Sequence, residues 1–114
     1  MRLAFDCVFH YVSDMDRAIS FYRDLPGFTF KSRDVVARFD IDGVLFELVP
    51  APRGHDTGGR GNARLCLSVD DIQEAVRYLE ARDIPVGEIQ DRDTGLLATF
   101  SDPDGNEICL WQYR

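Results

Sequence analysis

The sequence predicts an α+β fold in which one βαβββ module occurs twice in tandem. Three observations lead to this prediction: a repeat at half the chain length, an amphipathic helix in each copy, and three short strand candidates after each helix. With 114 residues the chain is long enough for one sizeable core. We therefore expect one domain over residues 1–114, with module 1 at 1–50, a linker at 51–62 and module 2 at 63–114.

The repeat is visible in residues 12–22 and 69–79, which are alike at an offset of 57 positions. Each segment follows an apolar run and places its own apolar residues at the 3.6-residue period of an amphipathic helix. The expected capping boxes begin at Ser13 and at Asp71, whose short polar side chains suit the free N–H groups of a first turn. Both segments are therefore predicted to be helices.

The ends of both helices and the strands after them follow from turn residues. Pro26 and Gly27 end the first helix, and the second ends before Pro85, which cannot continue helical hydrogen bonding. An Asp42–Gly43 step predicts a tight hairpin. The expected strands are residues 27–32, 35–40 and 43–49 in module 1, and 84–89, 95–101 and 106–112 in module 2.

Composition excludes several classes of protein. The apolar content of 45% and charged content of 29% are typical of a soluble globular chain, and no run approaches a membrane span. The net charge of −7 is spread along the chain, so we expect neither nucleic acid nor a membrane surface as a partner. Residues 1–6 lack the pattern of a signal peptide, and a cytoplasmic location is expected.

The chain has three cysteines, Cys7, Cys66 and Cys109. Their odd number, wide spacing and lack of a CxxC motif argue against a disulfide framework or a structural zinc site. Reduced thiols in a reducing compartment are the expectation.

The repeat, the Phe21–Tyr22 pair and the turn at residues 102–106 (Asp-Pro-Asp-Gly-Asn) together resemble the vicinal oxygen chelate superfamily. This group includes glyoxalase I, extradiol dioxygenases, fosfomycin-resistance enzymes and bleomycin-resistance proteins. The resemblance implies that the two modules form a curled mixed sheet around a cavity, with the helices on the outer face. It also implies that the first and last strands of each module carry site residues, typically His and Glu that hold a divalent ion.

In this chain the four positions that the resemblance implies are Cys7, Glu47, Arg64 and Cys109. Arg64 has no lone pair to give and its charge opposes a cation, so we expect no metal and no other cofactor. A zinc site made of Cys7, Glu47 and Cys109 remains an alternative.

Glu47 and Arg64 have two interpretations. They form a charge pair left in a partly buried pocket, or Arg64 binds a carboxylate or phosphate of a small ligand while Glu47 orients it. Cys7 and Cys109 are inert packing residues, or Arg64 lowers the pKa of a thiol and makes it nucleophilic. Because the positions that the resemblance implies converge on one point, the two sulfurs are also expected within disulfide range on oxidation. Cys66 is expected to serve packing.

Strand alternation predicts which aromatic residues accompany the site. Phe9 and Tyr11 share a face with Cys7, and Trp111 shares one with Cys109, so they either line a ligand pocket or fill the core. By the same alternation His10 faces the helix layer as a packed histidine. His55 lies in the linker and is expected to be solvated.

The sequence thus predicts metal-independent binding of a small anionic or aromatic molecule in the inter-module cavity, as in sequestering bleomycin-resistance proteins. One alternative is a divergent enzyme, a lyase or isomerase that uses Glu47 as base, Cys7 as nucleophile, or a Cys7–Glu47–Cys109 metal site. Another is an interaction module with a filled cavity. The resemblance also implies a homodimer, with modules paired within one chain or exchanged between two.

Overall fold

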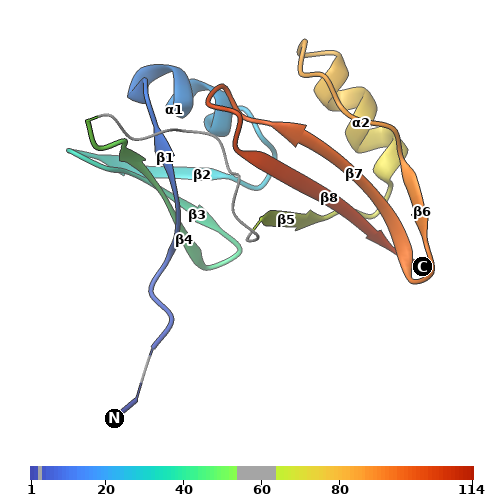
Figure 1. The fold of residues 1–114 in the computed structure, drawn as a ribbon, viewed down its shortest axis with the longest axis horizontal. Coiled ribbons are helices and arrows are strands. Elements are labelled where there is room, and N and C mark those ends of the chain that lie inside the picture. The colour runs from blue at the N-terminus through green and yellow to red at the C-terminus, as the bar shows by residue number, and fades with distance from the viewer. Residues whose placement is uncertain (3, 54–63) are drawn as a thin grey trace. The chain divides into compact units, whose positions relative to one another are not determined.

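The computed structural model describes residues 1–2, 4–53 and 64–114. The chain divides into two compact units, residues 1–57 and 58–114, referred to below as module 1 and module 2. Both follow the predicted order of one strand, one helix and three strands (Figure 1). Module 1 contains β1 (Val8–Val12), α1 (Met15–Arg23), β2 (Thr29–Arg33), β3 (Ala37–Ile41) and β4 (Val44–Pro50). Module 2 contains β5 (Leu65–Ser68), α2 (Ile72–Glu80), β6 (Gln90–Arg92), β7 (Gly95–Ser101) and β8 (Glu107–Tyr113).

Each module forms one four-stranded mixed sheet, and the two sheets have the same topology. The strand orders are β1-β4-β3-β2 and β5-β8-β7-β6. In both, the first strand pairs in parallel with the last, and the other neighbours are antiparallel. The α+β fold of tandem βαβββ modules predicted from the sequence is therefore confirmed.

The helices begin at aspartates. Asp71 caps α2 as predicted, because its Oδ1 accepts hydrogen bonds from the N–H groups of Gln73 (3.1 Å) and Glu74 (3.2 Å). In α1 the capping residue is Asp14, one position after the predicted Ser13, and its Oδ1 accepts from Arg17 N at 3.1 Å. The backbone of Asp14 is still extended, so the helix begins at Met15.

The core of each module lies between its helix and one face of its sheet. In module 1 it is aromatic: Tyr22 of α1 packs on Phe46 of β4 with ring centroids 5.0 Å apart, and both are fully buried. In module 2 it is mainly aliphatic, with Ile72 of α2 and Ile108 of β8 fully buried. Burial of each such side chain contributes about 1.5–3 kcal/mol to stability.

Five of the six strands predicted after the helices lie within three residues of their expected bounds. The Asp42–Gly43 hairpin is also confirmed, since both residues have the positive φ (52° and 82°) of a tight β-turn.

The strand predicted at residues 84–89 is wrong. There the chain makes only an isolated bridge, Val86 with Phe100, and β6 begins at Gln90. Pro85 has no N–H to give to a ladder, and the pairing here is limited to the bridge at Val86 and a hydrogen bond from Gly87 N to Thr99 O at 2.9 Å. Residues 54–62 of the predicted linker, with His55, lie outside the described residues.

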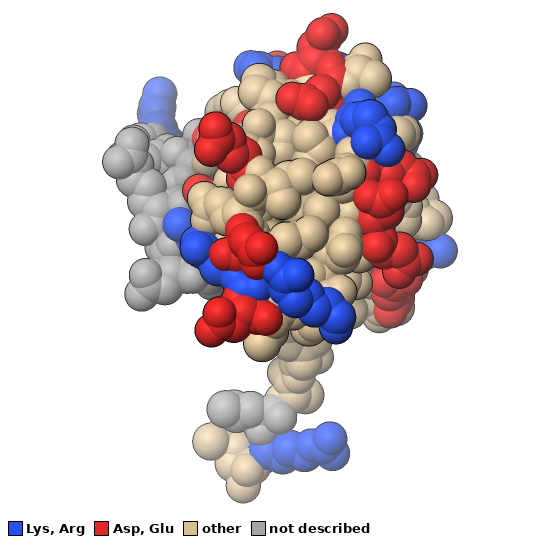
Figure 2. Space-filling view, turned by 90° about the vertical axis from the view of Figure 1, so that its right-hand side faces the viewer, with Lys and Arg blue, Asp and Glu red and all other residues tan. Residues whose placement is uncertain are grey.

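Charged side chains are dispersed over the described surface. On the face drawn in Figure 2, acidic and basic residues lie side by side around uncharged areas. The ion pairs Arg33–Asp16 and Arg114–Asp91 are exposed to solvent. Among the described residues no helix is long and apolar enough to cross a membrane.

Candidate functional site

The face of the module 1 sheet that points away from α1 carries the first group of predicted site residues. In the parallel pairing of β1 with β4, Phe9 lies opposite Glu47, whereas Val8 lies opposite the buried Phe46. Side chains alternate along a strand, so Phe9, Tyr11 and Glu47 project from the face opposite the helix. The predicted alternation of β1 is thus confirmed.

His10 projects to the other side, as predicted. Its Nδ1 lies 2.9 Å from the hydroxyl of Tyr22, and its ring packs edge-to-face on Phe46 at 5.2 Å. Tyr22 is fully buried in the core. His10 is therefore part of the packing between sheet and helix, and is not directed toward the face that carries Glu47.

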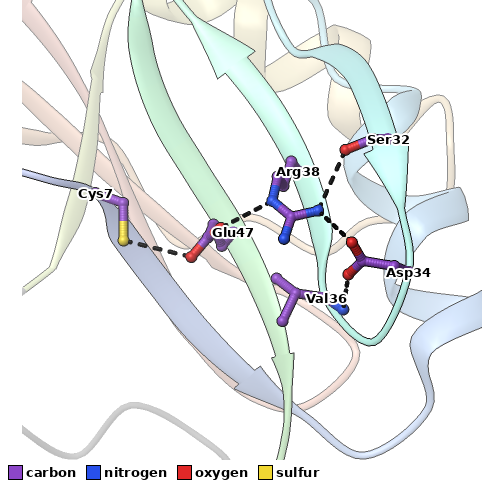
Figure 3. Close-up of polar contacts among 6 residues, drawn as sticks. All are labelled: Cys7, Ser32, Asp34, Val36, Arg38 and Glu47. Carbon is purple, nitrogen blue, oxygen red and sulfur yellow. Dashed lines mark hydrogen bonds and ion pairs between the residues drawn. The ribbon is translucent and has the colours of Figure 1, made fainter.

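Glu47 lies at the centre of a chain of polar contacts on three strands (Figure 3). Its Oε1 accepts a hydrogen bond from the Cys7 thiol at 3.5 Å, and its Oε2 lies 3.3 Å from Nε of Arg38. Arg38 in turn donates through one terminal nitrogen to Asp34 (3.0 Å) and Ser32 (3.4 Å). Both carboxylate oxygens of Glu47 are thus engaged inside module 1.

Arg38 is the residue of this group that the sequence reasoning missed. It lies directly opposite Glu47 in the antiparallel pairing of β3 with β4, so the two side chains share a face. Alternation along residues 35–40, with Ala37 and Phe39 apolar, already placed Arg38 on the face opposite the helix. The missing element was the register of β3 against β4, which a single sequence does not give.

Along this series of polar contacts, the pKa values of Asp34 and Cys7 are shifted in opposite directions. The pKa of Asp34 is lowered by a hydrogen bond from the backbone N–H of Val36 and by Arg38, which keeps that carboxylate ionised. The pKa of Cys7 is raised from 9.0 to about 11, first by burial and then by its hydrogen bond to the Glu47 carboxylate. Cys7 is therefore a neutral thiol at pH 7.

The corresponding face of module 2 carries Arg64, Cys109 and Trp111. Leu65 lies opposite Ile108, as Val8 lies opposite Phe46 in module 1, so Arg64 and Cys109 occupy the positions of Cys7 and Glu47. Arg64 Nε lies 3.7 Å from Glu107 Oε1, at an exposed edge. Glu107 is thus an ionic partner of Arg64 within its own module, and the predicted pairing with Glu47 stays a prediction.

Cys109 lies next to a second cysteine. It is the register partner of Cys66 on β5, and both thiols are free. The pKa of Cys109 is raised, mainly by burial and then by Cys66 and Glu107, while Arg64 acts weakly in the opposite direction. Neither Cys7 nor Cys109 therefore has the lowered pKa of an activated thiolate.

Trp111 is held against the backbone of Gly95. A Cβ atom at position 95 would lie 2.5 Å from the indole of Trp111 and 2.4 Å from the carbonyl oxygen of Gln112. Only glycine leaves room for the ring there. The indole also packs edge-to-face on Tyr113 at 5.8 Å, and Tyr113 itself is 72% exposed.

Within each module the structure thus brings the predicted residues to one face. Module 1 presents Cys7, Phe9, Tyr11 and Glu47, and module 2 presents Arg64, Cys109 and Trp111.

The donor set does not fit the divalent ion that the resemblance implies. Arg64 occupies one of the four positions and has no lone pair to give. In module 1 the thiol of Cys7 holds its proton, and Glu47 is engaged with Arg38. Across residues 1–2, 4–53 and 64–114, no three His, Cys, Asp or Glu side chains are gathered in an arrangement able to hold a metal.

Comparison with models of known protein families identifies one family that matches this chain. The model of the Glyoxalase/Bleomycin resistance protein/Dioxygenase superfamily matches residues 4–110. No curated protein matches the chain.

Several solved structures share the fold. TnmS3, an antibiotic binding protein from Streptomyces sp. CB03234, is 28% identical over 100% of this chain and 99% of that one, with a TM-score of 0.77. Lactoylglutathione lyase from Agrobacterium tumefaciens is 22% identical, with 96% and 92% covered and a TM-score of 0.77. The fosfomycin resistance protein FosX from Mesorhizobium loti is 14% identical, with 100% and 95% covered and a TM-score of 0.78. The last two show similarity of fold alone.

Proposed function

The chain belongs to the Glyoxalase/Bleomycin resistance protein/Dioxygenase superfamily, and on that basis we propose that it binds a small aromatic or anionic molecule without a divalent metal ion. In each module, the surface proposed for ligand contact is the sheet face that points away from the helix. The observation that carries the proposal is the aromatic surface on these faces.

In module 1 this surface is formed by Phe9 and Tyr11. Phe9 is 46% exposed and packs edge-to-face on Tyr11, with ring centroids 5.3 Å apart. Two rings whose purpose was only to fill the core would lie on the helix side, where Tyr22 and Phe46 lie. An aromatic pair that is partly open to solvent, beside polar side chains, is typical of a small-molecule contact surface.

Module 2 adds a second aromatic pair and a cation. Trp111 and Tyr113 pack on each other on the face that carries Arg64. The ion pair of Arg64 with Glu107 is long, at 3.7 Å, and exposed, so it is worth little to stability. A ligand carboxylate or phosphate therefore competes with Glu107 for the guanidinium of Arg64, which donates two parallel hydrogen bonds to such a group.

The similarity to TnmS3 supports the same class of function. That protein is an antibiotic binding protein, and the 28% identity extends over practically the full length of both chains. A binding role needs contact area and a few polar groups, which these faces supply, and it needs no catalytic base.

The chemistry of the four positions supports a metal-free mode of binding. Arg64 supplies a permanent positive charge where a metalloenzyme would have a ligand. Glu47 orients Arg38 and accepts from Cys7, so its carboxylate serves the polar framework of module 1.

The enzyme alternative has less support. A nucleophilic Cys7 requires the thiolate, and a pKa of about 11 leaves little of it at pH 7. A general base needs a free oxygen directed toward substrate, and both oxygens of Glu47 have partners.

The test uses 8-anilinonaphthalene-1-sulfonate, a fluorescent probe that is both aromatic and anionic, in buffer with EDTA. We expect saturable binding that weakens about tenfold, or about 1.4 kcal/mol, in Phe9→Ala and in Trp111→Ala. In Arg64→Ala we expect a weaker affinity and a smaller dependence on salt. Tyr78→Ala is the matched control, because this aromatic residue lies on α2. Binding that persists unchanged in all three site variants, or that disappears with EDTA, contradicts the proposal.

We further propose that the chain forms a homodimer, as the resemblance implies. Light scattering during size-exclusion chromatography at micromolar concentration tests this, with twice the mass of 13.0 kDa expected. The mass of a single chain at that concentration contradicts it.

A further inference from the structure

Cys66 and Cys109 form a pair of thiols on neighbouring strands of module 2. They are register partners in the parallel pairing of β5 with β8. Neighbouring strands lie about 4.8 Å apart, and register partners project to the same face of a sheet. The two side chains therefore stand side by side.

Both thiols are on the face of the sheet that points away from α2. Ile108 and Leu110, on either side of Cys109 in sequence, are buried on the helix side. Cys66 is exposed and Cys109 is half-buried, so the pair is open to solvent at Cys66. Arg64 and Glu107 lie two residues before Cys66 and Cys109, on the same face.

We propose that Cys66 and Cys109 together form a two-thiolate site for a soft monovalent metal ion, with Cu(I) as the chemical type. Thiolate sulfur is the protein ligand that selects Cu(I) over hard cations. The described residues gather no group of three or more His, Cys, Asp or Glu that could hold a metal. The pair therefore suits an ion that needs only two protein ligands. Zn²⁺ is usually four-coordinate and does not meet this condition.

The spacing favours such a bridge over a disulfide. Two metal–sulfur bonds of about 2.3 Å placed end to end span about 4.6 Å, close to the strand separation of about 4.8 Å. A disulfide instead needs Cβ atoms about 3.5–4.5 Å apart and a sulfur–sulfur bond of about 2.05 Å. Parallel side chains at the strand separation hold their Cβ atoms slightly beyond that range, so a disulfide requires the two side chains to tilt toward each other.

The charges near the pair suit the complex. Two neutral thiols and one M⁺ ion give a bis-thiolate complex of charge −1 and release two protons. The guanidinium of Arg64 lies on the same face, where it is paired with Glu107 at 3.7 Å, and it is the cation that the complex shares with that carboxylate. The influence of Cys66 and Arg64 on the pKa of Cys109 agrees with this proximity.

This site differs from the four positions that the family resemblance implies. Only Cys109 belongs to both, and Cys66 is absent from the first set. The inference does not depend on the proposed ligand binding, because it concerns the two sulfur atoms of module 2 alone.

The experiment titrates the reduced full-length chain, under nitrogen, into a Cu(I) complex of bathocuproine disulfonate. The chelator outcompetes single thiols, so loss of its colour counts the ions that the protein withdraws. We expect one Cu(I) per chain for the wild type and for Cys7→Ser, the matched control in module 1. We expect none for Cys66→Ser, whose exposed position makes the substitution safe for folding.

A second readout follows the thiols directly. With Cu(I) bound, Cys66 is expected to be protected from N-ethylmaleimide, whereas in the metal-free chain this exposed thiol reacts. No ion withdrawn by the wild type, or one ion still withdrawn by Cys66→Ser, overturns the proposal.

Discussion

Arg38 on β3 lies directly opposite Glu47 on β4, and the Arg38 Nε atom is 3.3 Å from Glu47 Oε2. The other oxygen of Glu47 accepts from Cys7 at 3.5 Å. A carboxylate held from both sides keeps one orientation on the sheet face, beside Phe9 and Tyr11. Both oxygens of Glu47 are therefore engaged by neighbouring side chains of module 1.

The first prediction concerns the reactivity of Cys7. In a Cys66→Ser/Cys109→Ser background, the rate of alkylation by iodoacetamide should rise with pH to a midpoint near 11, because burial and Glu47 both favour the neutral thiol. The variant Glu47→Gln should shift that midpoint to lower pH, since the carboxylate contribution is removed while burial remains. A midpoint at pH 9.0 or below in the background that retains Glu47 contradicts the raised pKa of Cys7.

The same raised pKa has a consequence for stability. The folded state binds the proton of Cys7 more tightly than the unfolded chain does. The protonated thiol therefore adds to the free energy of unfolding below pH 9.0, and this contribution is lost as pH rises toward about 11. Urea unfolding of the wild type should show a decrease in stability over this interval that is smaller in Cys7→Ser. An equal decrease in both proteins would assign the effect to other groups.

The second prediction concerns the packing of Trp111 against Gly95. Gly95→Ala should lower the free energy of unfolding by about 1–3 kcal/mol, because the added Cβ meets both the indole and the carbonyl oxygen of Gln112. Gly87→Ala is the matched control, since its Cβ would meet nothing closer than 3.6 Å. Urea unfolding followed by the fluorescence of Trp111, the single tryptophan, measures both. Equal effects of the two substitutions on the free energy of unfolding would refute this packing of Trp111 against Gly95.

The third prediction concerns the turn before β8. Asp102 is 5% exposed, and its carboxylate accepts hydrogen bonds from the N–H groups of Asp104 (2.9 Å) and Asn106 (2.8 Å) and from the Asn106 side chain (2.9 Å). Asp102→Ala should destabilise the chain by about 2–4 kcal/mol in thermal or urea unfolding. The exposed Asp70→Ala should change it by less than about 0.5 kcal/mol. A loss below 1 kcal/mol for Asp102→Ala would contradict this role.

The fourth prediction concerns the contact of His10 with Tyr22. Removal of the hydroxyl in Tyr22→Phe should lower stability by about 1 kcal/mol, because a partly buried partner of His10 is lost. Tyr113→Phe, at a site 72% exposed, is the control and should be nearly neutral. Chemical denaturation compares the two, and a neutral Tyr22→Phe would show that the contact contributes nothing.

Much of the fold could be predicted from the sequence because the signals are local and occur twice. Asp71 and the Asp42–Gly43 step have strong conformational preferences of their own, and both form the expected structures. The strand expected at residues 84–89, as one of three after the second helix, is wrong. Pro85 has no N–H for a ladder, and continuous pairing begins only at Gln90.

The candidate site was less accessible from sequence because it depends on pairing between strands. Alternation placed Phe9, Tyr11 and His10 on the correct faces of β1. Register brings Arg38 opposite Glu47 and Cys66 opposite Cys109, and no local pattern encodes it. Cys66 is exposed, so the expectation that it serves packing is wrong.

The central claim is that the site works without a divalent metal ion, and elemental mass spectrometry tests it most directly. Tag-free protein is analysed as purified and after incubation with Zn²⁺, Ni²⁺, Mn²⁺ and Fe²⁺ followed by desalting, with Glu47→Gln in parallel. We predict no stoichiometric divalent metal in either protein, because Arg64 occupies a ligand position and the carboxylate of Glu47 is engaged with Arg38. Stoichiometric metal in the wild type that is lost in Glu47→Gln would contradict the account and return Glu47 to the role of a metal ligand.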